Sequence, residues 1–154
     1  MTPEVLSEAD APTLKALGDL CMRSKAHWGY DNAFMAACAD VLRITKKDLK
    51  HPFAIIRVGP KYAGITQVTL HKYGADLSKL FVCPDHMGKG VGSALVTWAK
   101  ALAHAAGHAD LKVESDPAAE AFYARHGAIR IGLAPSEAIP GRMLPLLSIP
   151  THPS

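Results

Sequence analysis

The chain has 154 residues, of which 49% are hydrophobic and 20% are charged. This is the length of one domain. The composition can bury a core, which excludes a disordered chain and a miniprotein that depends on a metal for its fold. Lys and Arg number 17 against 14 for Asp and Glu, and the longest basic run is Lys46-Lys47, so nucleic-acid binding is not expected. No stretch approaches the ~20 apolar residues of a membrane span. We therefore expect residues 1–154 to form a single domain without a nucleic-acid or membrane partner.

The cysteines and the N-terminus indicate the cellular compartment in which the protein is expected. Cys21, Cys38 and Cys83 are isolated, odd in number and without metal-ligand spacing, which favours reduced thiols. An acid at Glu4 and the lack of a basic-then-apolar run argue against a signal peptide. We expect a cytoplasmic location.

The first third of the chain predicts two helices after, at most, a short strand at residues 5–6. Asp10 is a candidate N-cap for the first helix and Asp31 for the second, each followed by apolar residues at helical spacing. A polar and aromatic break at residues 24–30 separates the two helices.

From residue 53 the hydrophobic pattern changes to that of strands, which we expect at residues 53–58, 62–70 and 75–83. A Gly-rich turn then opens a long helix that Gly107 ends. The expected inward stripe of this helix is Val91, Leu95, Trp98 and Leu102.

The last third predicts a strand at 111–114, a helix from Asp116-Pro117 to Gly127, and strands at 129–133 and 143–149. Pro145 indicates that the last strand lies at an edge or carries a bulge. This order of elements predicts a mixed α/β domain.

The turn at Gly88, Gly90 and Gly92 is the most informative stretch, because it joins a strand to a helix. Glycines permit close backbone approach, and amides at a helix N-terminus favour an anion such as a pyrophosphate. The spacing fits neither the dinucleotide fingerprint nor a Walker A loop. An ordinary tight turn is the alternative interpretation.

This stretch resembles the acetyl-CoA motif of the GCN5-related N-acetyltransferase (GNAT) superfamily, V-x-P-x-x-(Q/R)-x-x-G-x-(G/A). Val82, Pro84, Gly90 and Gly92 fall on the motif, and Met87 departs from it, where Gln or Arg is usual. The resemblance is to a bacterial-type subgroup, and it does not indicate a particular substrate.

A second block, residues 111–128, is similar to the GNAT pattern L-x-V-x-x-N-x-x-A-x-x-F-Y-x-x-x-G. Asp116 replaces the usual Asn, and Tyr123 matches the family's Tyr. The resemblance extends from about residue 53 to 127. It implies an α/β (α+β) fold: a mixed, mostly antiparallel sheet of about six to seven strands flanked by about four helices.

The resemblance also implies an activity, namely direct transfer of an acetyl group from acetyl-CoA to a primary amine in a ternary complex, without a metal. His104 and His108 have helical metal-pair spacing, but the intervening Gly107 argues against a metal site. The residues expected to bind the cofactor are Phe81, Val82, Met87, Gly88, Lys89, Gly90, Val91, Gly92, Ser93, Asp116, Ala119, Phe122 and Tyr123.

Two catalytic residues are predicted. Tyr123 is expected to protonate the departing thiolate, and the alternative is a packed aromatic residue. Adjacent helical residues point about 100° apart, so an inward Phe122 leaves Tyr123 free to face a cleft. Asp76 is the candidate general base, provided that no bulge breaks the alternation of its strand, and a solvated acid is the alternative.

His27, Trp28 and Tyr30 are the candidate acceptor-binding residues, since aromatic rings attract a substrate ammonium; alternatively, Trp28 fills the core. Two other functions remain open: an acyl-CoA binding or sensing module, and an acetyltransferase acting on a protein or peptide amine. A small-molecule amine is favoured by analogy of fold alone. The sequence leaves the oligomeric state open, with a homodimer as one alternative.

Overall fold

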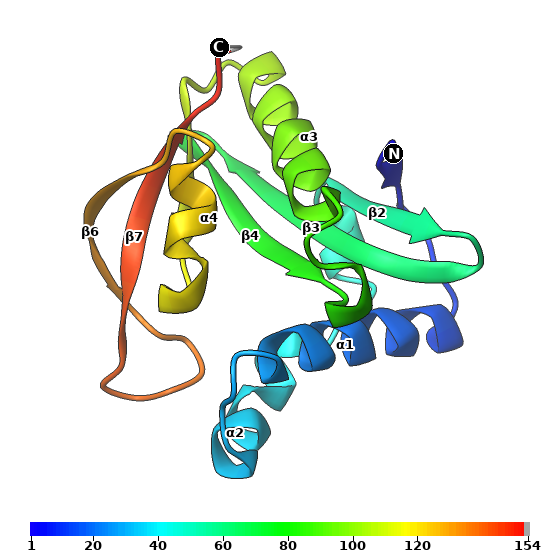
Figure 1. The fold of residues 1–154 in the computed structure, drawn as a ribbon. Coiled ribbons are helices and arrows are strands. Elements are labelled where there is room, and N and C mark those ends of the chain that lie inside the picture. Colours follow the sequence, from blue (N-terminus) through cyan, green and yellow to red (C-terminus); the bar gives the residue numbers. More distant parts are fainter. Residues whose placement is uncertain (153–154) are drawn as a thin grey trace.

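The computed structural model describes residues 1–152. The strands are β1 (Glu4–Val5), β2 (Phe53–Val58), β3 (Lys61–His71), β4 (Gly74–Val82), β5 (Asp110–Glu114), β6 (Ile129–Pro135) and β7 (Met143–Pro150). They form a seven-stranded sheet in the order β1-β2-β3-β4-β5-β7-β6 (Figure 1). Neighbouring strands are antiparallel except for β4 and β5, which are parallel.

The helices are α1 (Ala11–Ala26), α2 (Asn32–Leu42), α3 (Val91–Ala105) and α4 (Glu120–Ala124), with short 3-10 turns η1 (Asp48–Lys50), η2 (Pro84–His86) and η3 (Pro117–Ala119). Four helices on a mixed, mostly antiparallel sheet confirm the predicted fold. Within residues 1–152, no helix is both long enough and apolar enough to cross a membrane.

The predicted N-caps of α1 and α2 are present. The Asp10 carboxylate accepts from the Thr13 amide at 2.9 Å, and the Asp31 carboxylate accepts from the Phe34 amide at 2.8 Å. These bonds satisfy amides that have no partner within the first turn of a helix. They fix where both helices begin, and so where the segment between them lies.

The two faces of the sheet bury separate sets of side chains, because successive strand residues point to opposite sides. Ile55 packs in a cluster with residues of α1 and α2, while its neighbour Ile56 packs with Val91 and Leu95 of α3. A third cluster joins α3 and α4 to strands β3, β4, β5 and β7. The first two helices therefore cover one face, and α3 and α4 cover the other.

The buried stripe of α3 differs from the predicted one. Val91 and Leu95 are buried as expected, but Trp98 and Leu102 are only partly buried. Val96, Ala99 and Ala103 are fully buried instead. Small residues on this stripe let α3 approach the sheet closely, and the large Trp98 side chain lies beside the contact.

Pro145 predicted that β7 lies at an edge or carries a bulge. β7 is not an edge strand, since it lies between β5 and β6, and the register shift in its pairing with β6 falls between Arg130 and Gly132 of β6. Pro145 pairs with Leu133 of β6, and its carbonyl accepts from the Ser115 amide at 2.9 Å, just beyond the end of β5. The N and C=O of a strand residue point to the same side. The missing N–H of Pro145 therefore faces a position where β5 has ended, and no ladder bond is lost.

The sheet opens between β4 and β5. The two strands share one paired position, Asp76 with Lys112, and β4 continues for six more residues to Val82. Figure 1 shows β4 running away from β7 toward the N-terminal end of α3. This part of β4 has β3 as its partner on one side and is open on the other.

A bulge lies at the opening. Gln67 of β3 pairs with Lys79, and Val68 pairs with Leu77, so Ser78 is an extra residue on β4. Leu77 packs with the α3 cluster before the bulge, and Leu80 and Val82 do so after it. The bulge therefore reverses the odd–even alternation along β4.

Candidate active site

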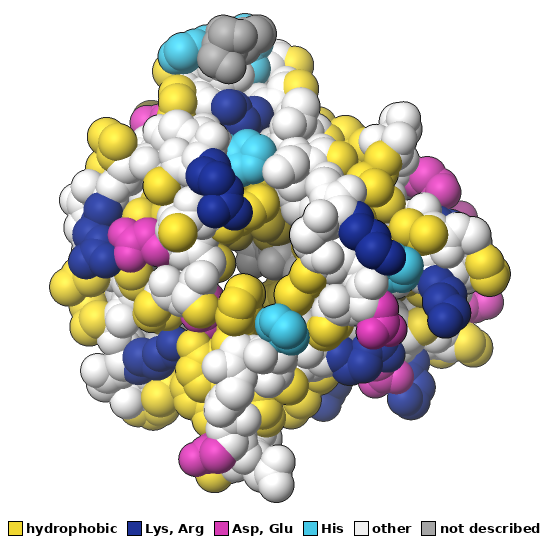
Figure 2. Space-filling model, in the orientation of Figure 1, with side chains coloured by type: hydrophobic (Ala, Val, Ile, Leu, Met, Phe, Trp, Pro, Cys, Tyr) yellow, Lys and Arg dark blue, Asp and Glu magenta, His cyan; other side chains and the backbone are white. Residues whose placement is uncertain are grey.

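A cavity of about 600 Å³ lies where β4 and β5 separate. Its walls come from the end of α1, β4, the turn before α3, the end of β5, and α4. Figure 2 shows the hollow opening at the surface between α3 and α4, with hydrophobic side chains around it. A volume of this size suits a small ligand or cofactor.

The Gly-rich turn forms one end of the cavity. Gly88 and Gly90 have φ of 77° and 86°, and Gly90 is the N-cap of α3. A Cβ atom at Gly92 would lie 3.1 Å from the Phe122 ring, so glycine permits this contact between α3 and α4. The N-terminal amides of α3 have no intrahelical acceptors, and together with the helix dipole they provide a site for an anion.

The cavity brings together all but one of the residues predicted to bind the cofactor. Lys89 is exposed and lies outside the lining. The predicted residues that line the cavity are Phe81, Val82, Met87, Gly88, Gly90, Val91, Gly92, Ser93, Asp116, Ala119, Phe122 and Tyr123.

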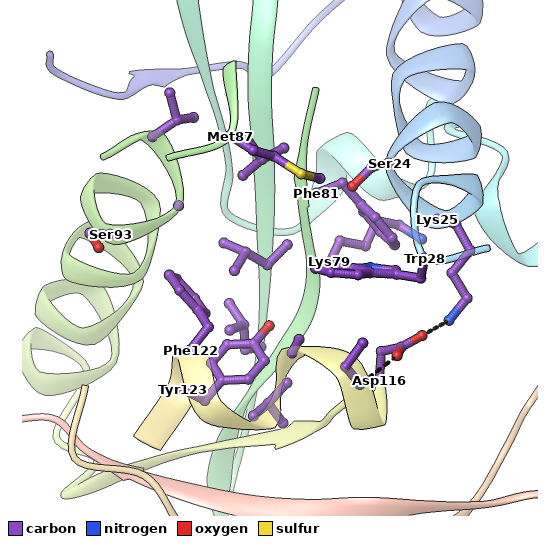
Figure 3. A pocket seen from close by; sticks show the side chains of 18 of the residues that line it. Ser24, Lys25, Trp28, Lys79, Phe81, Met87, Ser93, Asp116, Phe122 and Tyr123 are labelled. Atoms are coloured by element: carbon purple, nitrogen blue, oxygen red, sulfur yellow. Dashed lines mark hydrogen bonds and ion pairs between the residues drawn. The ribbon is translucent and has the colours of Figure 1, made fainter. Parts of the chain in front are cut away.

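The Tyr123 side chain is buried in the α3–α4 cluster, while its hydroxyl points into the cavity (Figure 3). Phe122 is less buried than Tyr123, so the expected order of the two rings is reversed. Burial raises the pKa of Tyr123, and the negative charge of Asp116 raises it further. The hydroxyl therefore keeps its proton at neutral pH, and within residues 1–152 it makes no hydrogen bond.

Asp116 joins several segments at the opposite end of the cavity. Its Oδ2 accepts from the Lys25 Nζ at 2.6 Å and from the Tyr30 hydroxyl at 2.8 Å, and the Arg142 Nη2 lies 4.0 Å away. Its Oδ1 accepts from the Ala118 amide at 2.9 Å. Burial raises the pKa of Asp116, but the bonds from Lys25, Ala118 and Tyr30 outweigh it and hold the pKa below the ordinary value of 3.8.

The three predicted acceptor-binding residues lie in different environments. Trp28 lines the cavity and is 43% exposed, so it does not fill the core. His27 packs edge-on against Trp28 with ring centroids 5.3 Å apart, outside the lining. Tyr30 is also outside the lining; it stacks on Phe34 and bonds to Asp116. Trp28 alone of the three contacts the cavity.

Asp76 also lies outside the cavity lining. Its carboxylate is 3.1 Å from the His71 Nε2 and 47% exposed. Ala75 and Leu77 pack on the α3 side, so Asp76 points to the other face, and the bulge at Ser78 places it on the face opposite to Val82.

Several lining residues were not anticipated from the sequence. Ser24 and Lys25 belong to the last turn of α1, a few residues before Trp28, and no motif in the sequence includes them. Glu114 ends β5 at the opening. Lys79 follows the bulge at Ser78 on β4, and no motif in the sequence includes it.

Comparison with known proteins identifies the family of this chain. A family model described as an acetyltransferase (GNAT) domain matches residues 50–127, half of the chain. The chain belongs to this family of acyltransferases. No curated protein matches it.

Solved structures extend the likeness over the whole chain. A GCN5-related N-acetyltransferase from Rhodopseudomonas palustris superposes with a TM-score of 0.75 at 18% identity, covering 97% of this chain and 94% of that one. An aminoglycoside 6′-N-acetyltransferase complexed with coenzyme A gives 0.73 at 12% identity, covering 100% and 99%. The ribosomal-protein-S18-alanine N-acetyltransferase from Escherichia coli gives 0.66 at 18%, covering 99% and 96%. These proteins share the fold, and the names of the last two give different acceptors, an aminoglycoside and a ribosomal protein.

The Asp116 junction yields a stability prediction. Asp116→Asn leaves the cations Lys25 and Arg142 near a neutral side chain, and we expect it to lower the free energy of unfolding by about 2 kcal/mol at pH 7. Because folding lowers this pKa, the carboxylate contributes fully above pH 4, and its contribution is lost as pH falls through the folded value. The difference between wild type and variant should therefore shrink below pH 4, measured by urea unfolding.

Asp19→Asn is the matched control, because the Lys15–Asp19 pair is exposed. An equal effect of the two substitutions, or a pH-independent effect of Asp116→Asn, would contradict a buried ionic junction.

Proposed function

We propose that this protein transfers an acetyl group from acetyl-CoA to a primary amine of a small molecule, by direct attack within a ternary complex. The observation that carries the proposal is a single cavity that contains an anion-binding turn, an open strand edge and a protonated Tyr123 hydroxyl. The family membership supports the reaction class.

Acetyl-CoA would lie along the opening in an extended form. The pyrophosphate would bind the amides at the start of α3, from Gly88 to Ser93. The amides of the pantetheine would pair with the free edge of β4, where β5 has diverged. The thioester would then lie near Tyr123, and a backbone N–H near Val82 would stabilise the oxyanion.

Tyr123 would be the general acid. A group that keeps its proton at neutral pH can donate it to the thiolate as CoA leaves. The hydroxyl points into the cavity and is not engaged by another described side chain.

We assign the general base to Glu114 in place of Asp76. Both carboxylates lie on the face of the sheet opposite to α3, because Val113 and Leu77 pack on the α3 side. Glu114 lines the cavity and forms no ion pair within the described residues, whereas Asp76 lies outside the lining and pairs with His71. Glu114 is thus the acid that an incoming ammonium would meet.

Two other functions remain. An acyl-CoA sensing module would bind acetyl-CoA without turnover on any amine, and the departures at Met87 and Asp116 favour it. A protein-modifying enzyme would need a groove for a peptide. The small-molecule proposal is favoured because Trp28 and the Asp116 junction bound the acceptor end of the cavity.

The first prediction concerns the anion site. Ser93→Glu places a negative charge in the first turn of α3, and we expect it to weaken acetyl-CoA binding about 10- to 100-fold through repulsion of the pyrophosphate. Ser93→Gln, which matches Glu in size but has no charge, should lose much less affinity. Calorimetric titration measures both, and equal losses in the two variants would contradict the charge argument. No binding by the wild type at millimolar acetyl-CoA would overturn the proposed function.

The second prediction concerns the acid. Tyr123→Phe should lower kcat about 10²- to 10³-fold, because the thiolate leaves without a proton donor, while acetyl-CoA affinity is unchanged. Release of CoA thiol with an accepted amine measures kcat. Tyr62→Phe, on β3 outside the cavity, is the control. Retention of full kcat by Tyr123→Phe would rule out the acid role.

The third prediction separates the two candidate bases. Glu114→Gln should lower kcat/KM about 10²-fold or more at pH 7, and the loss should diminish at higher pH as the amine substrate itself loses its proton. Asp76→Asn should leave the whole pH–rate profile unchanged. The reverse result would return the role to Asp76, and no effect of either would leave the proton to solvent.

A further inference from the structure

Lys79 is a cation at the acceptor end of the cavity without a carboxylate partner among residues 1–152. The other cations there are engaged: Lys25 forms an ion pair with Asp116, and Arg142 donates to the Tyr30 hydroxyl at 2.8 Å. Lys79 is partly buried, and its Nζ has one contact, a 3.4 Å bond to the Val41 carbonyl at the end of α2.

An ammonium has three donors, and a cation withdrawn from water is stable only when an anion or acceptors compensate it. One long bond to a carbonyl leaves most of this capacity unused. The Ser24 hydroxyl also points from α1 into the cavity and has no bond partner among the described residues (Figure 3). Together, Lys79 and Ser24 provide donors for an anionic group of a ligand.

Glu114 gives the cavity its opposite charge. Lys79 reaches the α2 carbonyl, so it lies on the α1–α2 face of β4; Glu114 lies on the same face of β5, because its neighbour Val113 packs toward α3. Both residues line the cavity, one on each side of the opening between the strands. Lys79 and Glu114 therefore bring a basic and an acidic side chain to the lining of one cavity, and neither forms an ion pair among residues 1–152.

We propose that the acceptor is an amine that also carries a carboxylate, namely a free amino acid with an apolar side chain. Its carboxylate would bind Lys79 and Ser24, its ammonium would face Glu114, and its side chain would lie near Trp28 and Phe81. This inference rests on the proposed acetyl transfer and names the substrate class for it. An acceptor with several positive charges, such as a polyamine, would be repelled by Lys79.

The transfer step balances with these groups alone. Glu114 accepts one proton from the ammonium, and the freed nitrogen lone pair forms a bond to the thioester carbonyl carbon. The tetrahedral intermediate then breaks its C–S bond, and the thiolate takes a proton from Tyr123. One of the two protons still on the nitrogen is lost to solvent, so that the product amide keeps one N–H, and Tyr123 is reprotonated through Glu114 or solvent. The products are an N-acetyl amino acid and CoA.

The test compares matched acceptors. Leucine, methionine and phenylalanine are assayed beside their primary amides and the amines that lack the carboxylate. We expect kcat/KM to be at least about 10-fold higher for the acids, because a site that provides donors for a group rejects the analogue that lacks it.

Variants of Lys79 then assign the preference to this residue. Lys79→Met should lower kcat/KM for the acids about 10- to 100-fold and leave the amides within about 3-fold, whereas Lys79→Arg should keep part of the preference. Lys112→Met, on β5 outside the cavity lining, is the matched control and should have no effect.

Each outcome decides the inference. Equal or better use of the amides and amines, equal losses for all acceptors in Lys79→Met, or no acetylation of any acid by protein that binds acetyl-CoA would overturn it. If the protein binds acetyl-CoA in any of those cases, the proposed acetyl transfer still stands, with another acceptor. Failure to bind acetyl-CoA would overturn both. Circular dichroism of each variant excludes loss of folding as the cause.

Discussion

The separation of β4 from β5 is the constraint on which the rest of the structure depends. The strands share a single paired position, and β4 then continues to Val82 with one side open. Unpaired strand edges within a protein are costly, because every buried amide and carbonyl needs a partner. A ligand with amide groups of its own can supply those partners, so the open edge of β4 is suited to bind such a ligand.

The other parts of the site are placed relative to this opening. β4 ends at the Gly-rich turn, so the N-terminus of α3 necessarily lies at one end of the cavity. β5 leads into the Asp116 cap and α4, which brings Tyr123 under the opening from the other side. Asp116 then ties this wall to Lys25 of α1 and, through Tyr30, to Arg142 before β7. A carboxylate at this position, with two cations around it, holds these segments together at one end of the cavity.

The sequence predicted most of the fold because its signals were local. Asp10, Asp31 and the glycine turn mark element boundaries, and all three behave as expected. The errors came from tertiary effects. Pro145 suggested an edge, but the end of β5 relieves the same constraint inside the sheet. The spacing of Trp98 fits the buried stripe of a helix, but Ala99 and Ala103 are buried instead, because they are small enough for α3 to pack closely against the sheet.

The candidate site shows the same division between local and tertiary signals. The residues predicted to bind the cofactor, except Lys89, line one cavity, because most of them come from one turn and one short helix, and their role stays a prediction. The opposite end of this cavity is assembled from α1, β4 and β5, and a one-residue bulge at Ser78 sets on which face of β4 Lys79 lies. Alternation without that bulge favours Asp76 and overlooks Lys79.

The division has a functional consequence. The names of two proteins with this fold give acceptors as different as an aminoglycoside and a ribosomal protein, so the fold alone does not determine the acceptor. In the proposed function, acceptor choice belongs to Ser24 and Trp28 from α1, Lys79 from the bulged strand, and Glu114 at the end of β5. A balanced cation and carboxylate across one opening favour a ligand with both charges over a ligand with either alone. The bulge at Ser78 places Lys79 on the same face of the sheet as Glu114, which is the arrangement that such a ligand requires.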